Sequence, residues 1–283
     1  MKKIILLLVV LFASMLGVSA ADCDYSCVAP YNLNNKFRAV FSNITGANAL
    51  VENRLESILK KEVLKIASAD EIKINIDSYS PKDLKNGIFK SLYVNGKNVV
   101  INNIYLDSLE LKTLCDFNYI KQSGKEIVFV EEMPLSFSLS MTDETLNKTI
   151  QNEKYQKIIK DLNRIGNSYG VLLQIASTKV SVKNNKLYYV IGFDVPFINQ
   201  EHKIVIQTDL RVKDGKINFN NTRLVSNKFN LNLSKLDFII NYLNPFDYSV
   251  QIFDNKNAKV IVKNVELKEN KISASGVMVV PKD

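Results

Sequence analysis

Histidine, the side chain used most often as a general base, occurs once in this 283-residue sequence, at His202. The stretch Gln200–Lys203 around it is polar and typical of a solvated turn between strands. Glu131 and Glu132 could form an acid–base pair, but neighbouring residues of a strand point to opposite faces. The sequence contains no GxSxG elbow, HExxH zinc motif, P-loop or dinucleotide-binding glycine motif. We therefore expect no enzymatic activity, no catalytic residues and no cofactor.

Three cysteines, Cys23, Cys27 and Cys115, are the other residues that could carry chemistry. In an exported protein two of them can pair, which leaves the third free or paired between chains. Cys23 and Cys27 lie close together, so the sequence leaves open a local disulfide or a link from this segment to Cys115. A metal site is not expected, because a CxxC motif and the acidic spacing of a calcium-binding loop are both absent.

The N-terminus has the pattern of a secretory signal peptide. Met1–Lys3 is a short basic start, Ile4–Leu16 is an apolar run, and Gly17–Ala20 supplies the small residues that a signal peptidase reads. We expect cleavage after Ala20, with Ala21 as the next site. The apolar run is too short to span a bilayer. The sequence therefore predicts an exported protein of the periplasm or cell envelope that is soluble after cleavage.

The net charge bears on the class of partner. The chain carries a formal charge of +8, and loss of Lys2 and Lys3 with the signal peptide leaves 8 minus 2, or +6. A basic exported protein can bind anionic lipid headgroups, acidic glycans or nucleic acid. The lysines are scattered over polar positions, and no nucleic-acid-binding motif is present. We expect no nucleic-acid partner.

Helical periodicity is clearest over Asn48–Ala67, where apolar residues recur three and four positions apart. Two helices broken near Asn152 are expected over residues 142–165, with Thr142 as the cap of the first. A short helix is expected from Ser234 to the stop at Asn244–Pro245.

Strand periodicity covers most of the remaining chain, with apolar residues at every second position. Leu92–Thr113 is the clearest case, and Asn95–Gly96 within it is a hairpin signal. Asn184–Asn185 and Asp214–Gly215 mark hairpins in a second block of strands. Hairpins dominate and βαβ spacing is absent, which favours an α+β fold with a long, curved, mostly antiparallel sheet. We expect a signal peptide (residues 1–20), a cysteine-bearing leader (21–47) and a single domain (48–283).

Several stretches, taken in their order, resemble the LmeA-like family of exported bacterial phospholipid-binding proteins. They are the helix ALVENRLESILKK, the strand Ile72–Ile76, the segment Gly87–Leu92 with the alternating run after it, Thr142–Asn147, Asn244–Phe246 and the closing strand with Ser275–Gly276. The likeness covers roughly Asn48 to Val280, and the cysteine-bearing leader lies outside it.

The resemblance implies a tubular lipid-binding (TULIP-like) architecture, a half-barrel in which a curved antiparallel sheet wraps a long amphipathic helix and encloses an acyl-chain groove. It implies a phospholipid or another acyl lipid as the ligand. The expected function is therefore phospholipid binding in the cell envelope, with lipid transport as one use. The alternatives are a non-enzymatic structural or interaction module with a self-filled core and, less favoured, an enzyme acting on envelope lipids or glycans.

The apolar faces of the first helix and of the short late helix are expected to line the groove. These residues are Leu50, Val51, Leu55, Ile58, Leu59, Leu236, Ile239, Ile240 and Leu243. Lys60, Lys61 and Lys65 are expected near the groove mouth, where flexible point charges add a modest, salt-sensitive preference for anionic lipid. Peripheral contact with a membrane surface fits this charge, while no protein partner is predicted.

Overall fold

The computed structural model describes residues 27, 47–65, 67–123, 126–168, 174–195, 198–225, 244, 246 and 259–283. The predicted signal peptide, most of the cysteine-bearing leader and the predicted late helix with Leu236, Ile239, Ile240 and Leu243 lie outside the described residues. Those predictions therefore stay predictions.

The largest sheet has seven strands in the order β1-β4-β5-β8-β14-β13, with β2 also paired to β4. Every pairing in it is antiparallel. Its strands are β1 (Ala67–Ser68), β2 (Glu71–Asp77), β4 (Ser91–Ile101), β5 (Ile104–Thr113), β8 (Met133–Thr142), β13 (Lys259–Lys268) and β14 (Lys271–Val280).

The register of this sheet places buried apolar residues in rows on one face. One row runs across the strands from β2 to β8 and consists of Ile74, Val94, Leu111 and Phe137. It continues through Gly276 of β14 to Val262 of β13. The neighbouring row on the other face is polar for most of its length and includes Lys73, Asn95, Glu110, Ser138 and Ser275. The sheet is therefore one-sided, as strand periodicity predicts.

The Leu92–Thr113 stretch confirms the predicted strand pattern but corrects its turn. All its alternating apolar residues are buried. The hairpin turns at Asn102 and Asn103, both with positive φ (50° and 67°), while Asn95–Gly96 lies inside β4. A Cβ on Gly96 would lie 2.6 Å from Cγ2 of Val99, so the glycine serves close packing instead of a turn.

The second sheet has the order β12-β11-β10-β9 and is also antiparallel. Its strands are β9 (Gln174–Lys183), β10 (Lys186–Val195), β11 (Ile198–Lys213) and β12 (Lys216–Leu224). Positive φ angles at Asn184, Asn185, Asp214 and Gly215 confirm the two predicted hairpin turns. The turn predicted at His202 is wrong, because this residue lies within β11 opposite Phe193.

A third, three-stranded sheet contains β3 (Ile88–Phe89), β6 (Asn118–Ser123) and β7 (Glu126–Phe129). Glu131 and Glu132 follow β7 and precede β8, so they lie in a connection and not in a strand. The prediction that strand geometry separates their carboxylates is corrected accordingly.

Four described helices accompany the sheets: α3 (Ala47–Val63), α4 (Pro81–Lys85), α5 (Asp143–Ile150) and α6 (Glu153–Ser168). α3 confirms the first predicted helix, although it ends before Ala67, which begins β1. The break predicted near Asn152 separates α5 from α6. Thr142 caps α5 in a capping box with Thr145, as its position predicts.

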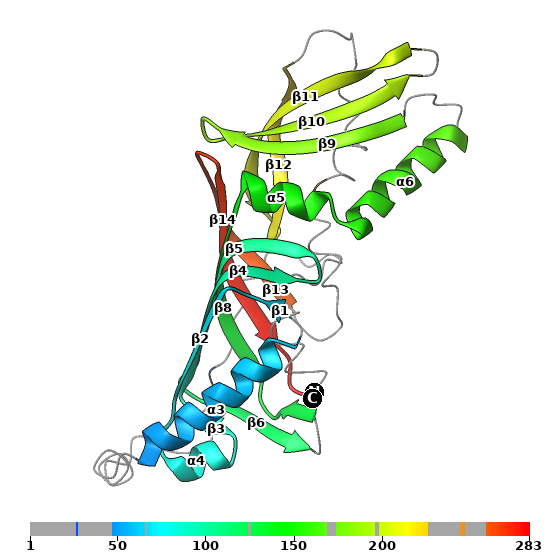
Figure 1. Ribbon diagram of the computed structural model, residues 1–283. Helices are drawn as coiled ribbons and strands as arrows, with labels where there is room; N and C mark the ends of the chain where they lie inside the picture. The colour runs from blue at the N-terminus through cyan, green and yellow to red at the C-terminus, as the bar shows by residue number, and fades with distance from the viewer. Residues whose placement is uncertain are drawn as a thin grey trace.

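The molecule is elongated, with α3 and α4 at one end and the second sheet at the other (Figure 1). α3 lies along β2 and α5 contacts β5, β8 and β9. Two backbone hydrogen bonds connect the sheets: Val262 N–H donates to Gly215 O (2.9 Å) and Asn270 N–H to Val182 O (3.1 Å). One apolar core runs from Val63 to Val280 through both sheets. The α+β, mostly antiparallel prediction is confirmed.

Candidate functional site

Helix α3 is fixed to the edge of the large sheet by two glutamates one helical turn apart. A carboxylate oxygen of Glu56 accepts from the Ile76 N–H (2.8 Å), and one of Glu52 accepts from the Ser78 N–H (3.0 Å) and hydroxyl (2.6 Å). Four helix residues rise about 6 Å and two strand residues about 6.7 Å, so the spacings match. The N–H of Ile76 in the edge strand β2 and that of Ser78 just after the strand are satisfied in this way.

This attachment decides which side of α3 faces the core. Leu55 and Leu59 are half-buried and pack against the core cluster, and Val63, one turn further, is buried. Val63 was missed by the sequence prediction, although its spacing of four from Leu59 was visible. Ile58 is 47% exposed and lies on the outer face. Leu55 and Leu59 therefore stay candidates for lining the predicted groove, whereas Ile58 does not.

The remaining predicted lining residues have no described side chain. Leu50 and Val51 belong to α3, but the structure does not describe their side-chain environment. The predicted residues of the late helix lie outside the described ranges. Lys60, Lys61 and Lys65 are exposed on or just after α3, as expected for residues that could reach a ligand's headgroup or a membrane.

Helix α5 repeats the edge-capping device on β9, the edge of the second sheet. The Asn147 amide accepts from the Val180 N–H (2.9 Å) and donates to the Val180 carbonyl (2.7 Å). Asp143 accepts from the Val182 N–H (2.8 Å), and Gln151 donates to the Thr178 carbonyl (2.9 Å). Three helix residues spaced by four thus meet three strand residues spaced by two. They hold α5 between the two sheets.

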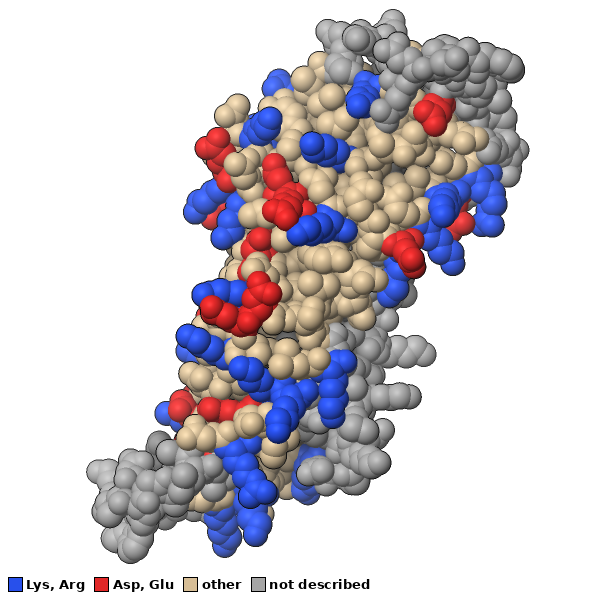
Figure 2. Space-filling model, viewed as in Figure 1, with Lys and Arg blue, Asp and Glu red and all other residues tan. Residues whose placement is uncertain are grey.

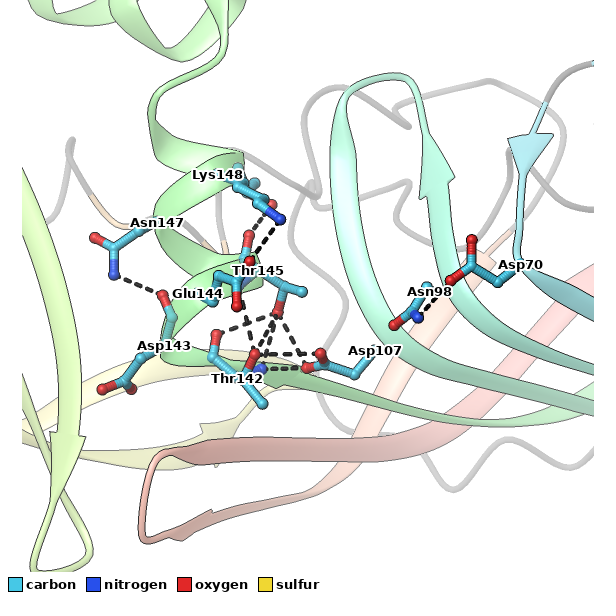
Figure 3. A network of polar contacts seen from close by, with 10 residues as sticks. Asp70, Asn98, Asp107, Thr142, Asp143, Glu144, Thr145, Asn147 and Lys148 are labelled. Carbon is cyan, nitrogen blue, oxygen red and sulfur yellow. Dashed lines mark hydrogen bonds and ion pairs between the residues drawn. The ribbon is translucent and has the colours of Figure 1, made fainter.

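The first turn of α5 is also anchored to the large sheet (Figure 3). The Asp107 carboxylate of β5 accepts from the Thr142 N–H, from the Thr142 hydroxyl (3.2 Å) and from the Thr145 hydroxyl (3.1 Å). A negative charge at this point also stabilises the positive end of the helix. Asp107 is therefore explained as a structural anchor.

The interior between α6 and the second sheet contains a buried pair of phenols. Tyr155 and Tyr189 are fully or almost fully buried, and their hydroxyl oxygens lie 2.6 Å apart. Burial raises the pKa of Tyr189 and outweighs the lowering by its hydrogen bond with Tyr155. A phenol whose pKa is raised stays protonated at neutral pH, so Tyr189 contributes a hydrogen bond to the core.

Of the two disulfides that the sequence left open, the structure contains the link to Cys115: Cys27 and Cys115 form a disulfide over a sequence separation of 88. Cys115 is buried in the connection between β5 and β6. The disulfide thus ties Cys27 of the predicted leader to the connection that leads from β5 of the large sheet to β6 of the third sheet. Cys23 lies outside the described residues.

Ion pairs lower the pKa of two exposed glutamates among the described residues. Hydrogen bonding from Lys97 lowers the pKa of Glu71, and hydrogen bonding from Lys148 lowers that of Glu144.

A group of three or more potential metal ligands is not found in the part of the chain that the structure describes. Within those same residues, no helix is long and apolar enough to cross a membrane.

Comparison with known proteins finds no family model, no curated protein and no solved structure that matches this chain. The likeness to the LmeA-like family therefore stays a prediction from sequence.

Proposed function

We propose that this protein is an exported phospholipid-binding protein of the cell envelope that holds acyl chains against the apolar face of its curved sheet. The observation that carries the proposal is that one-sided face. Its rows of buried apolar residues extend from β2 to β13. The described helices contact β2, β3, β5, β8 and β9, and β13 is contacted by β11 and β12 of the second sheet. Acyl chains laid against such a face gain about 0.8 kcal/mol per buried CH₂.

The disulfide supports the exported location. Structural disulfides persist in oxidising compartments and are rare in the cytosol. The Cys27–Cys115 bond, together with the signal-peptide pattern of the first 20 residues, therefore favours the periplasm or the outer cell envelope. Lipid exchange between envelope membranes would use such a protein as a carrier, and we include that role in the proposal.

α3 supplies the proposed wall of the groove in the TULIP-like arrangement. Its half-buried Leu55 and Leu59 face the sheet, while its glutamates hold it at the sheet edge. In this proposal lipid enters between α3 and the sheet, and no catalytic group takes part.

A second candidate is a non-enzymatic interaction module whose core is filled by its own side chains. The observation that favours it is the completeness of burial: Ile104, Leu106, Leu109 and Leu111 are at most 1% exposed. A core packed this completely would leave acyl chains no room at those four positions.

Uptake of a fluorescent phospholipid by a Leu55→Trp variant separates the two candidates. If Leu55 lines a groove, the larger side chain lowers uptake with little loss of unfolding free energy. If Leu55 is plain core, overpacking costs roughly 1–3 kcal/mol. Lys154→Trp, at an exposed position of α6, is the matched control and leaves both quantities unchanged. Loss of stability without any change in uptake would remove Leu55 from the proposed site.

A further inference from the structure

The outward face of α3 is cationic and carries exposed apolar side chains. Its exposed described residues, including the turn after the helix, are Asn53, Arg54, Ser57, Ile58, Lys60, Lys61, Leu64 and Lys65. At about 100° per residue these positions fall in one continuous sector of the helix. Every charged residue among them is positive. Ile58 (47%) and Leu64 (44%) are two of the three large apolar residues that are exposed among the described ones.

The acidic residues of α3 that the structure describes do not neutralise this face. Glu52 and Glu56 point to the opposite side, where their carboxylates accept hydrogen bonds from Ile76 of β2 and from Ser78 just after it. The two glutamates that attach α3 to the sheet therefore place their negative charges away from the outward face of the helix. Among the α3 side chains that the structure describes, the exposed charged ones are therefore all positive.

Helix α4 enlarges the same surface. It contacts α3 and exposes Lys82 and Lys85, whereas its one acid, Asp83, is buried and bonded to the Ser80 hydroxyl (2.6 Å). Lys and Arg side chains gather over the end of the molecule where Figure 1 places these helices (Figure 2). Among described exposed charged residues of the two helices and the turn after α3, none is acidic.

We propose that this surface, defined by Arg54, Ile58, Lys60, Lys61 and Leu64, docks the protein onto an anionic lipid bilayer. Cations near an anionic membrane gain from its negative surface potential, and exposed aliphatic side chains insert at the boundary of headgroups and acyl chains. An acidic polymer would use the cations but would leave Ile58 and Leu64 in water. Nucleic acid would favour aromatic side chains for stacking, and the exposed described residues of α3 include none.

The proposal does not depend on lipid uptake into the fold, because docking uses the outward face of α3 and uptake would use the inward one. A variant of the outer face can therefore lose docking and keep uptake. The two functions fail in separate assays.

Vesicle co-sedimentation of the purified protein tests the docking surface. The probes are phosphatidylcholine vesicles with and without added phosphatidylglycerol, at low and high salt. The wild-type protein is expected to bind the phosphatidylglycerol vesicles at low salt and to bind them more weakly, but still measurably, at high salt. The variant Arg54→Gln/Lys60→Gln/Lys61→Gln should bind at least about tenfold more weakly. The variant Ile58→Ser/Leu64→Ser should lose the part of binding that survives high salt.

The matched control removes the same charge from the far end of the molecule. Lys179→Gln/Lys183→Gln/Lys271→Gln changes three exposed lysines of β9 and β14 and should bind like the wild type. Circular dichroism confirms that each variant is folded. Two outcomes overturn the proposal: the wild-type protein does not bind the anionic vesicles, or both triple variants weaken binding equally. Wild-type protein that binds a soluble polyanion such as polyphosphate, but not the vesicles, overturns it as well.

Discussion

Lys186 of β10 and Asp209 of β11 form a cross-strand ion pair in the second sheet. Asn221 also donates to the Asp209 carboxylate (3.1 Å). Hydrogen bonding from Lys186 is the largest cause that lowers the pKa of Asp209 below its ordinary value of 3.8, and burial opposes it. Because the pKa falls on folding, the ionised carboxylate stabilises the folded state.

The pH dependence of this stabilisation follows from the direction of the shift. A lowered carboxyl pKa contributes stability above the unfolded value, 3.8, and loses it as pH falls through the folded value. Asp209→Asn should therefore lower the unfolding free energy at neutral pH by up to about 1 kcal/mol, the range of partly exposed pairs. The difference from wild type should shrink as pH falls below 3.8 and vanish once pH is below the lowered folded pKa.

Urea unfolding at a series of pH values measures this difference. Asp194→Asn removes an exposed carboxylate from the same sheet and serves as the control. A gap between wild type and Asp209→Asn that stays constant down to strong acid would contradict the assigned role of the ion pair.

At the scale of elements, the two edge strands β2 and β9 are each capped by helix side chains. Asn147 is the clearest case, since one amide satisfies both the N–H and the carbonyl of Val180. Asn147→Ala leaves both groups without that partner and should cost about 2 kcal/mol of unfolding free energy. Lys154→Ala, an exposed change on α6, should stay within about 0.5 kcal/mol.

Hydrogen exchange at the Val180 amide gives a local readout of the same prediction. It should accelerate in Asn147→Ala and remain slow in Lys154→Ala. Equal stability of Asn147→Ala and the wild type would mean that water replaces the amide at no cost, and the edge-capping account would be wrong.

The disulfide joins the N-terminal segment to the connection after β5. In the chain-entropy model, closing a loop of 88 residues stabilises the fold by about 4–5 kcal/mol. A reducing agent should therefore lower the melting temperature of the wild type and leave Cys27→Ser/Cys115→Ser unaffected. Cys23→Ser should keep the wild-type sensitivity to the reductant. If Cys23→Ser abolishes that sensitivity, the pairing is different.

The sequence predicted elements well where local pattern alone decides them. Alternation in Leu92–Thr113 and the hairpins at Asn184–Asn185 and Asp214–Gly215 are local properties, and the structure has all three. The turn at Asn95–Gly96 failed because Asn-Gly is also compatible with a strand where a neighbour, Val99, packs against the glycine. His202 failed because a polar stretch can equally be the solvent-facing part of a long strand.

The candidate site could be predicted only in part for a related reason. Leu55 and Leu59 follow from helical periodicity, and the structure places both against the core. Which side of α3 faces outward depends on Glu52 and Glu56 bonding to β2, a strand 20 or more residues away. No local pattern encodes that contact, so Ile58 was assigned to the inner face.

At the scale of the whole molecule, a one-sided antiparallel sheet lies between helices α3 and α4 at one end and the second sheet at the other (Figure 1). Its apolar rows explain the strand periodicity that dominates the sequence. The two faces of α3 differ in composition. The inward face carries Leu55 and Leu59 beside the two glutamates that bond to the sheet, and the outward face carries exposed cations with Ile58 and Leu64. This division is what a protein needs to hold a lipid on one side of a helix and meet a membrane with the other.

Native mass spectrometry of the purified protein, followed by lipid extraction of the same sample, tests phospholipid binding most directly. The account predicts a population whose mass exceeds that of the chain by one phospholipid, and recovery of that phospholipid in the extract. A sample that carries no lipid and takes up none when offered phospholipid would contradict the proposed function and favour the self-filled interaction module.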